Sequence, residues 1–222
     1  MSSGQVTAAQ PAPTDTDGGR KVTKPRGWIP RLVKPAVFLL SLVPLVLLAV
    51  AVFTGNAGAN PIETVERDTG EWTLRFLCLT LFATPLSRLF KSAWPVRLRR
   101  MIGLFAFFYA ALHLLSYLWL DHWFAWSDIL ADILKRPYVT IGFLSFLILL
   151  PLAVTSNRWA VKKLARRWAA LHRWVYLAAV LGVIHFVWLT KGDQLEPVIY
   201  LLIILGLLAY RMGVLLKADG SK

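Results

Sequence analysis

The chain has 222 residues, of which 57% are hydrophobic and only 17% are charged, a composition too apolar for a protein whose whole surface meets water. Its net charge is nevertheless +13, which in a soluble protein would indicate a polyanionic partner such as nucleic acid. The single cysteine, Cys78, excludes an internal disulfide, and the sequence has neither a CxxC motif nor a Cys/His spacing typical of zinc.

Residues 1–34 are rich in Ser, Thr, Pro, Gly and Asp, end in a basic stretch and lack apolar periodicity, so we expect a disordered tail. Six apolar runs follow, each close to the ~20 residues that cross a ~30 Å hydrocarbon core as a helix. They cover roughly 35–54, 72–90, 101–120, 138–155, 169–190 and 196–216. The sequence therefore predicts an all-α integral membrane protein, with a six-helix transmembrane domain at 35–216 and a C-terminal tail at 217–222.

The first run has an alternative interpretation as a secretion signal, because Ala57-Gly58-Ala59 resembles a signal-peptidase site. The run is about 20 residues long, whereas a signal core usually has about 7–15. Its length favours a helix that is retained in the membrane.

The basic residues predict the orientation of the chain. With the N-terminus in the cytoplasm, that side carries six Lys and Arg in 1–34, five in 88–100, five in 156–167 and three after 210, hence 19, against four on the other side. Because Lys and Arg in short loops favour the cytoplasmic side, we expect both termini in the cytoplasm. The charge excess then needs no nucleic acid to explain it.

Three histidines fall within the apolar runs, where an ionisable side chain is costly and indicates a functional site. His113 belongs to the third run, and His172 and His185 belong to the fifth. A rise of ~1.5 Å per residue places His113 about 18 Å, His185 about 24 Å and His172 about 5 Å from the cytoplasmic surface. His113 and His185 are therefore expected at similar depths. His122 lies in an outer loop, where we expect it to be solvated.

Small residues accompany these two histidines at helical spacing, namely Ala110, Ala106 and Gly103 before His113, and Gly182 and Ala178 before His185. Such residues serve close helix packing or leave room for a flat macrocycle. Two neutral imidazoles facing each other across that gap suit the axial positions of a haem iron. The alternative is a pair of buried histidines that hydrogen-bond to neighbouring helices.

His172 requires separate treatment, because a 13-residue separation places it about 140° from His185 around a straight helix. Arg99 and Arg100 lie at its level, at the cytoplasmic end of the third run. They suit haem propionates or lipid phosphates.

Arg75, one turn after Glu71, is interpreted as forming a self-contained ion pair or as part of a quinone or substrate site. No P-loop, GxGxxG, HExxH or nucleophile-elbow motif is present.

Several segments carry a resemblance to a known family: TGEW at 69–72, TPLSR at 84–88, RRMIGL at 99–104, LHLLSY at 112–117, KRPY at 135–138, LAVTS at 152–156, RWAALHRWVY at 167–176 and IHF at 184–186. Together they closely resemble the MsrQ family, also called YedZ, over about residues 30–216. The resemblance implies a ferric-reductase-like transmembrane protein that keeps the haem-bearing helices and lacks flavin and NADPH domains.

The resemblance implies an electron-transfer subunit of the bacterial inner membrane rather than a catalytic subunit. It would carry electrons from membrane quinones, or from a cytoplasmic flavin reductase, to the periplasmic molybdoenzyme MsrP, which reduces methionine sulfoxide in periplasmic proteins. His113, His172 and His185 correspond to the haem-associated histidines, and FMN is a further cofactor of the family. We expect His113 and His185 to bind one b-type haem between the third and fifth helices, with a second haem or a flavin near His172.

Two other functions stay open at this stage. A small transporter or proton-conducting protein would also place histidines within the membrane. A ferric reductase would keep the haem and use a different electron acceptor.

Overall fold

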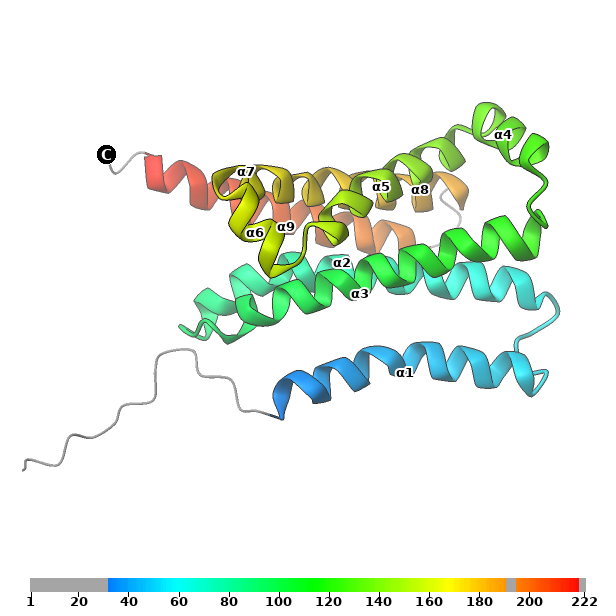
Figure 1. Cartoon of the computed structure of the whole chain (residues 1–222), viewed down its shortest axis with the longest axis horizontal. Coiled ribbons are helices and arrows are strands. Elements are labelled where there is room, and N and C mark those ends of the chain that lie inside the picture. The colour runs from blue at the N-terminus through cyan, green and yellow to red at the C-terminus, as the bar shows by residue number, and fades with distance from the viewer. Residues whose placement is uncertain (1–31, 191–194, 220–222) are drawn as a thin grey trace, which may run out of the picture.

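A computed structural model of the protein describes residues 32–190 and 195–219 (Figure 1). Every regular element in these residues is helical, which confirms the all-α prediction. The helices are α1 (Val33–Phe53), α2 (Pro61–Leu89), α3 (Trp94–Ser116), α4 (Trp126–Lys135), α5 (Pro137–Val154), α6 (Arg158–Leu164), α7 (Arg166–Leu171), α8 (Val175–Leu189) and α9 (Leu195–Asp219), with a π turn at Tyr117–Asp121 and a 3-10 turn at His172–Trp174. Of the two predicted tails, residues 1–31 and 220–222 lie outside the described residues.

Five stretches among the described residues are long and apolar enough to cross a membrane: Val33–Phe53, Trp94–Asp121, Pro137–Val154, Arg166–Leu189 and Leu195–Val214. The chain is thus a multi-pass membrane protein, as predicted. The remaining predicted run lies in α2, whose 29 residues extend over about 44 Å. α2 is less apolar than the others and buries Thr69, Glu71 and Thr80. The count of six spans stays a prediction.

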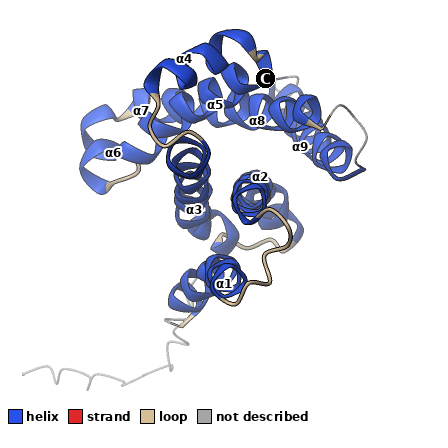
Figure 2. Ribbon diagram, turned by 90° about the vertical axis from the view of Figure 1, so that its right-hand side faces the viewer, coloured by secondary structure: helices blue, strands red, loops and turns tan. Residues whose placement is uncertain are grey.

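α2 lies at the centre of the bundle, and this position explains its polar residues. It packs against α1, α3, α8 and α9, and Figure 2 shows it end-on among them. Its buried side chains include Leu74, Phe76, Leu77 and Leu81. The faces of α2 that meet these helices are shielded from lipid, so the polar groups on those faces find partners inside the protein.

The long helices run side by side, and the basic segments gather at one end of the bundle (Figure 1). That end holds the α2–α3 connection, α6, α7 and the C-terminal part of α9, whereas α4 and the α1–α2 connection lie at the other. The two ends are called the basic end and the α4 end below. The separation of basic segments agrees with the arrangement that the loop charges predict.

α1 is attached to the bundle through a tyrosine hydroxyl inserted into its backbone. The hydroxyl of Tyr109, on α3, donates to the carbonyl of Ser41 at 2.9 Å and accepts from the N–H of Leu45 at 3.2 Å. In a regular helix these two groups bond each other, but Pro44 lies between them and disturbs the helix at this point. The tyrosine hydroxyl therefore bonds both of these backbone groups in the turn of α1 that contains the proline.

Several elements differ from the sequence prediction, α2 and the fifth run among them. α2 begins at Pro61, well before the apolar run, because the side chain of Asn60 caps it by accepting from the N–H of Glu63 and proline suits the first turn. The fifth run, predicted as one straight helix, is divided into α7 and α8 by the 3-10 turn at His172–Trp174. The angular estimate between His172 and His185 therefore does not apply.

Candidate functional site

His113 on α3 and His185 on α8 face each other inside the bundle. Their ring centres are 6.2 Å apart, and the ring planes are inclined by 73°. The two histidines that the sequence places at similar depths are thus neighbours in the structure. An ion bound to both rings, with metal–nitrogen bonds of about 2 Å, needs ring centres about 6 Å apart.

Each imidazole is oriented by a backbone carbonyl of another helix. Nδ1 of His113 lies 2.8 Å from the carbonyl oxygen of Glu66 on α2, and Nδ1 of His185 lies 2.7 Å from that of Tyr138 on α5. Because a carbonyl only accepts, Nδ1 carries the proton in both rings, and Nε2 keeps its lone pair. This is the arrangement that metal-binding histidines ordinarily show.

A glycine makes room for each of these hydrogen bonds. A methyl group added at Gly142 would lie 2.7 Å from Nδ1 of His185, and one added at Gly70 would lie 3.3 Å from Nδ1 of His113. Each glycine stands four residues after the carbonyl that its histidine uses, so its own N–H bonds the same oxygen within the helix. We call Gly70 and Gly142 the two backing glycines.

The backing glycines could not be predicted from the spacing around the histidines, because they belong to the helices opposite them. Of the small residues that accompany the two histidines in the sequence, Ala110 and Gly182 line the space around the imidazoles, and the others serve helix packing. Ala106 and Ala178 are completely buried, and a methyl group at Gly182 would meet Leu74 and Ser145. Gly70 lies in the TGEW segment, which carries part of the family resemblance. That resemblance was the sequence signal that could have pointed to this glycine.

A cavity of about 490 Å³ surrounds the two imidazoles, within the range of about 300–1,000 Å³ typical of ligand pockets. Residues of α2, α3, α4, α5 and α8 form its walls, which are largely apolar, including Leu74, Leu114, Phe143, Phe146 and Phe186. Among the described residues no group of three or more His, Cys, Asp or Glu forms a site for a bare ion. Two imidazoles in an apolar cavity instead fit haem, whose macrocycle supplies the other ligands of the iron.

Polar residues gather where the cavity reaches the α4 end of the bundle. Arg67 and Arg136 line it there, together with Glu66, Tyr117 and Asp121. Oε1 of Glu66 and the hydroxyl of Tyr117 are buried and have no hydrogen-bond partner among the described residues. An apolar chamber with guanidiniums and an unused hydroxyl at one end suits a flat apolar ligand that carries acidic groups at its edge.

Arg99 and Arg100, predicted as cofactor-binding residues, do not line this cavity. The guanidinium of Arg100 instead donates to the carbonyl of Ser156, with Nε at 2.8 Å. Nε2 of His172 lies 3.4 Å from the hydroxyl of the same serine, while the ring of His172 stacks on Trp168 with centres 3.9 Å apart. His172 and Arg100 therefore both contact Ser156 at the basic end, away from the imidazole pair.

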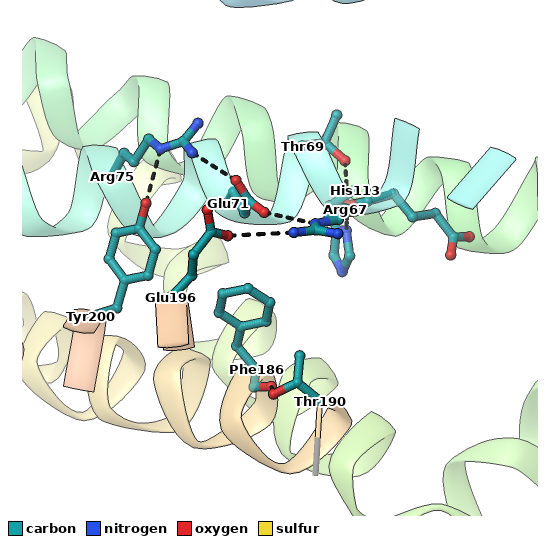
Figure 3. Close-up of polar contacts among 10 residues, drawn as sticks. Arg67, Thr69, Glu71, Arg75, His113, Phe186, Thr190, Glu196 and Tyr200 are labelled. Atoms are coloured by element: carbon teal, nitrogen blue, oxygen red, sulfur yellow. Dashed lines mark hydrogen bonds and ion pairs between the residues drawn. The ribbon is translucent and has the colours of Figure 1, made fainter. Parts of the chain in front are cut away.

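Arg75 is not the self-contained ion pair predicted from the sequence. The carboxylate of Glu71, whose side chain is 7% exposed, bonds Arg75 at 2.7 Å and Arg67 at 3.0 Å. Arg75 also donates to the hydroxyl of Tyr200 at 2.9 Å, and Arg67 pairs with Glu196 at 3.5 Å (Figure 3). This network joins α2 to α9 beside the cavity.

The expectation that His122 is simply solvated was also wrong. Its side chain is 16% exposed, and Nε2 lies 3.4 Å from Asp121 and 3.5 Å from Asp132. Its ring packs edge-on against Tyr117 at 4.6 Å. α4, which the sequence analysis treated as part of a loop, supplies Asp132 and so encloses His122.

Comparison with known proteins gives two consistent results. Residues 69–183 match the family described as "Ferric reductase like transmembrane component". Over 184 residues the chain is 48% identical to a protein of Herminiimonas arsenicoxydans named "Protein-methionine-sulfoxide reductase heme-binding subunit MsrQ", covering 82% of this chain and 84% of that protein. Proteins of the same name from Rhodospirillum rubrum and Caulobacter vibrioides are 52% and 44% identical, covering 82% and 87% of this chain and 88% and 92% of theirs.

Proposed function

The chain belongs to the ferric reductase-like transmembrane family and to its MsrQ heme-binding subunits, and on this premise we propose that it binds a b-type haem between His113 and His185. The protein then serves as the membrane electron-transfer subunit of a protein-methionine-sulfoxide reductase system. Its partner is a periplasmic reductase of the MsrP type. The donor is the quinone pool or a cytoplasmic flavin reductase.

The observation that carries the proposal is the orientation of the two imidazoles. Both rings hold their Nδ1 protons on carbonyls of other helices, at 2.8 Å for His113 and 2.7 Å for His185. Both Nε2 atoms are thereby left as neutral ligands. Each histidine is oriented by a carbonyl that lies 47 residues away in the sequence. When bound between them, haem supplies reversible one-electron chemistry.

The other residues of the cavity have distinct roles in this proposal. The apolar walls exclude water and so influence the potential of a bound iron. Arg67, Arg136 and the hydroxyl of Tyr117 hold the propionate groups, because they are the donors at the polar end of the cavity. Arg99 and Arg100 remain candidates only for a cofactor near His172, because they do not line this cavity.

The orientation of the chain in the membrane is part of the proposal. Membership of the family supports an inner-membrane location, and the loop charges favour both termini in the cytoplasm. In this orientation the imidazole cavity lies toward the periplasm. His172, at the basic end with Arg99 and Arg100, lies near the cytoplasmic entry for electrons. A second haem or an FMN there is supported by resemblance alone, because His172 does not line the cavity around the imidazoles.

An optical experiment tests the proposal. The purified full-length protein should show a Soret band that shifts on reduction, with one haem per chain lost in both His113→Ala and His185→Ala. His122→Ala is the matched control, because His122 lies outside the cavity, and it should keep the band. A colourless wild-type protein with pH-dependent flux in vesicles would instead support a transporter.

A second measurement identifies the electron acceptor. Reduced protein is mixed with a periplasmic molybdoenzyme of the MsrP type or with a ferric chelate, and haem reoxidation is followed. Fast reoxidation by the molybdoenzyme is expected. Reoxidation by the ferric chelate alone would indicate a ferric reductase.

A further inference from the structure

A second, smaller cavity lies toward the basic end of the bundle, between α2, α8 and α9. Its volume is about 100 Å³, and its polar lining residues are Thr84, Arg88, Tyr176, Tyr210 and Arg211. Arg88 stands in the last turn of α2 and Tyr176 at the start of α8, whereas His185 lies near the other end of α8. The cavity is therefore separate from the imidazole site.

Arg211 is held in place by two contacts. Its Nη1 donates to the hydroxyl of Thr84 at 3.3 Å, and its guanidinium carbon lies 4.8 Å from the centre of the Tyr176 ring. A guanidinium has five N–H donors, so a single bond to Thr84 leaves most of them available. The hydroxyl of Tyr176 is buried and has no hydrogen-bond partner among the described residues.

The charges of this cavity are not balanced by acidic side chains. Among the side chains described, in 32–190 and 195–214, neither Arg88 nor Arg211 pairs with a carboxylate. No Asp or Glu is found in the cavity lining. Two guanidiniums and an unused hydroxyl donor indicate an anion with several oxygen atoms.

Size and location narrow the choice of anion. A volume of about 100 Å³ accommodates a group of a few water-sized atoms, such as a phosphate, and not a haem or flavin ring. The residues that line the cavity come from the last turns of α2, the start of α8 and the C-terminal half of α9, which lie toward the basic end of the bundle (Figure 1). Basic pockets between transmembrane helices on the cytoplasmic side bind lipid headgroups.

We propose that Arg88, Arg211 and Tyr176 form a binding site for a phosphate group, supplied by the headgroup of an anionic phospholipid. Free phosphate is the other source of the same chemistry. The site does not depend on haem, so a negative result here would leave the function proposed above unaffected, and the reverse also holds.

The test uses the full-length protein, purified in detergent and depleted of lipid. Phosphatidylglycerol binding is measured by native mass spectrometry, and inorganic phosphate binding by thermal stabilisation. Arg88→Gln with Arg211→Gln should weaken phosphatidylglycerol binding roughly tenfold or more for each guanidinium, and Tyr176→Phe about threefold. The matched control is Arg97→Gln, which removes one exposed charge at the same end and should leave binding within about twofold.

The outcomes separate the sources and allow refutation. Phosphate binding that depends on both arginines, without lipid binding, supports the site and makes free phosphate its ligand. Equal binding to the wild type and the double variant overturns the site, and so does an equal loss in Arg97→Gln, which would indicate a general effect of surface charge. Tyr176→Phe keeps the test decisive if the double variant does not fold, because it removes a single oxygen atom.

Discussion

Replacing Gly142 with alanine should weaken haem binding without damaging α5. The added methyl group would lie 2.7 Å from Nδ1 and 3.0 Å from Cε1 of His185, whereas ordinary van der Waals contact begins at 3.4 Å. The imidazole must therefore move by the difference, about 0.7 Å, or lose its bond to the carbonyl of Tyr138. Loss of the outer partner of a metal-bound histidine lowers metal affinity about 10–100-fold, and we expect a loss of that size.

The measurement is the haem content per chain and the rate at which haem passes to an excess of a haem-scavenging protein. Gly206→Ala is the matched control, because nothing lies within 4 Å of the added methyl group, and Gly70→Ala should be intermediate, with a closest contact of 3.3 Å. Alanine favours a helix by about 1 kcal/mol over glycine, so a weakened helix cannot account for haem loss. Wild-type haem retention in Gly142→Ala, or an equal loss in Gly206→Ala, would refute the reasoning.

Three further predictions concern other contacts. Glu71→Gln removes the charge between two guanidiniums and should lower the free energy of unfolding by about 1–3 kcal/mol, seen as earlier thermal loss of haem; an unchanged midpoint would contradict a structural role for the network. Tyr109→Phe should cost about 1 kcal/mol and increase protease access to α1, and equal cleavage in both proteins would argue against the tyrosine bridge. His172→Ala should keep the reduced spectrum of the haem in the imidazole cavity, and loss of that spectrum would show that His172 is one of its ligands.

The pairing of His113 with His185 could be predicted from the sequence because it depends on two robust quantities. The asymmetry of Lys and Arg between loops gives the direction of each helix, and the rise per residue gives the depth of each side chain. The structure brings these two rings to a centre distance of 6.2 Å. Depth alone does not reveal which neighbour orients a ring, so the carbonyls of Glu66 and Tyr138 stayed unknown.

The residues that face the histidines from neighbouring helices could not be predicted, because their position depends on how each helix is rotated about its axis. A soluble helix shows its buried face as an apolar stripe, but a helix between lipid and protein is apolar on both sides. The sequence around Gly142 therefore gives no indication that this glycine faces His185. α4 was missed for another reason: its ten residues are too short for a span, and a search for membrane helices treats them as a loop.

The hydrogen bonds of the three histidines also distinguish their roles. Nδ1 of His172 lies 3.2 Å from the carbonyl of Trp168, four residues earlier in its own segment, so its ring lies against that segment whatever the neighbouring helices do. His113 and His185 are each bonded to a carbonyl 47 residues away in sequence, so their orientation exists only when α3 packs on α2 and α8 packs on α5. Correct packing of these four helices thus points both Nε2 atoms into one cavity, and any substitution that shifts either helix pair should change the haem spectrum before it unfolds the protein.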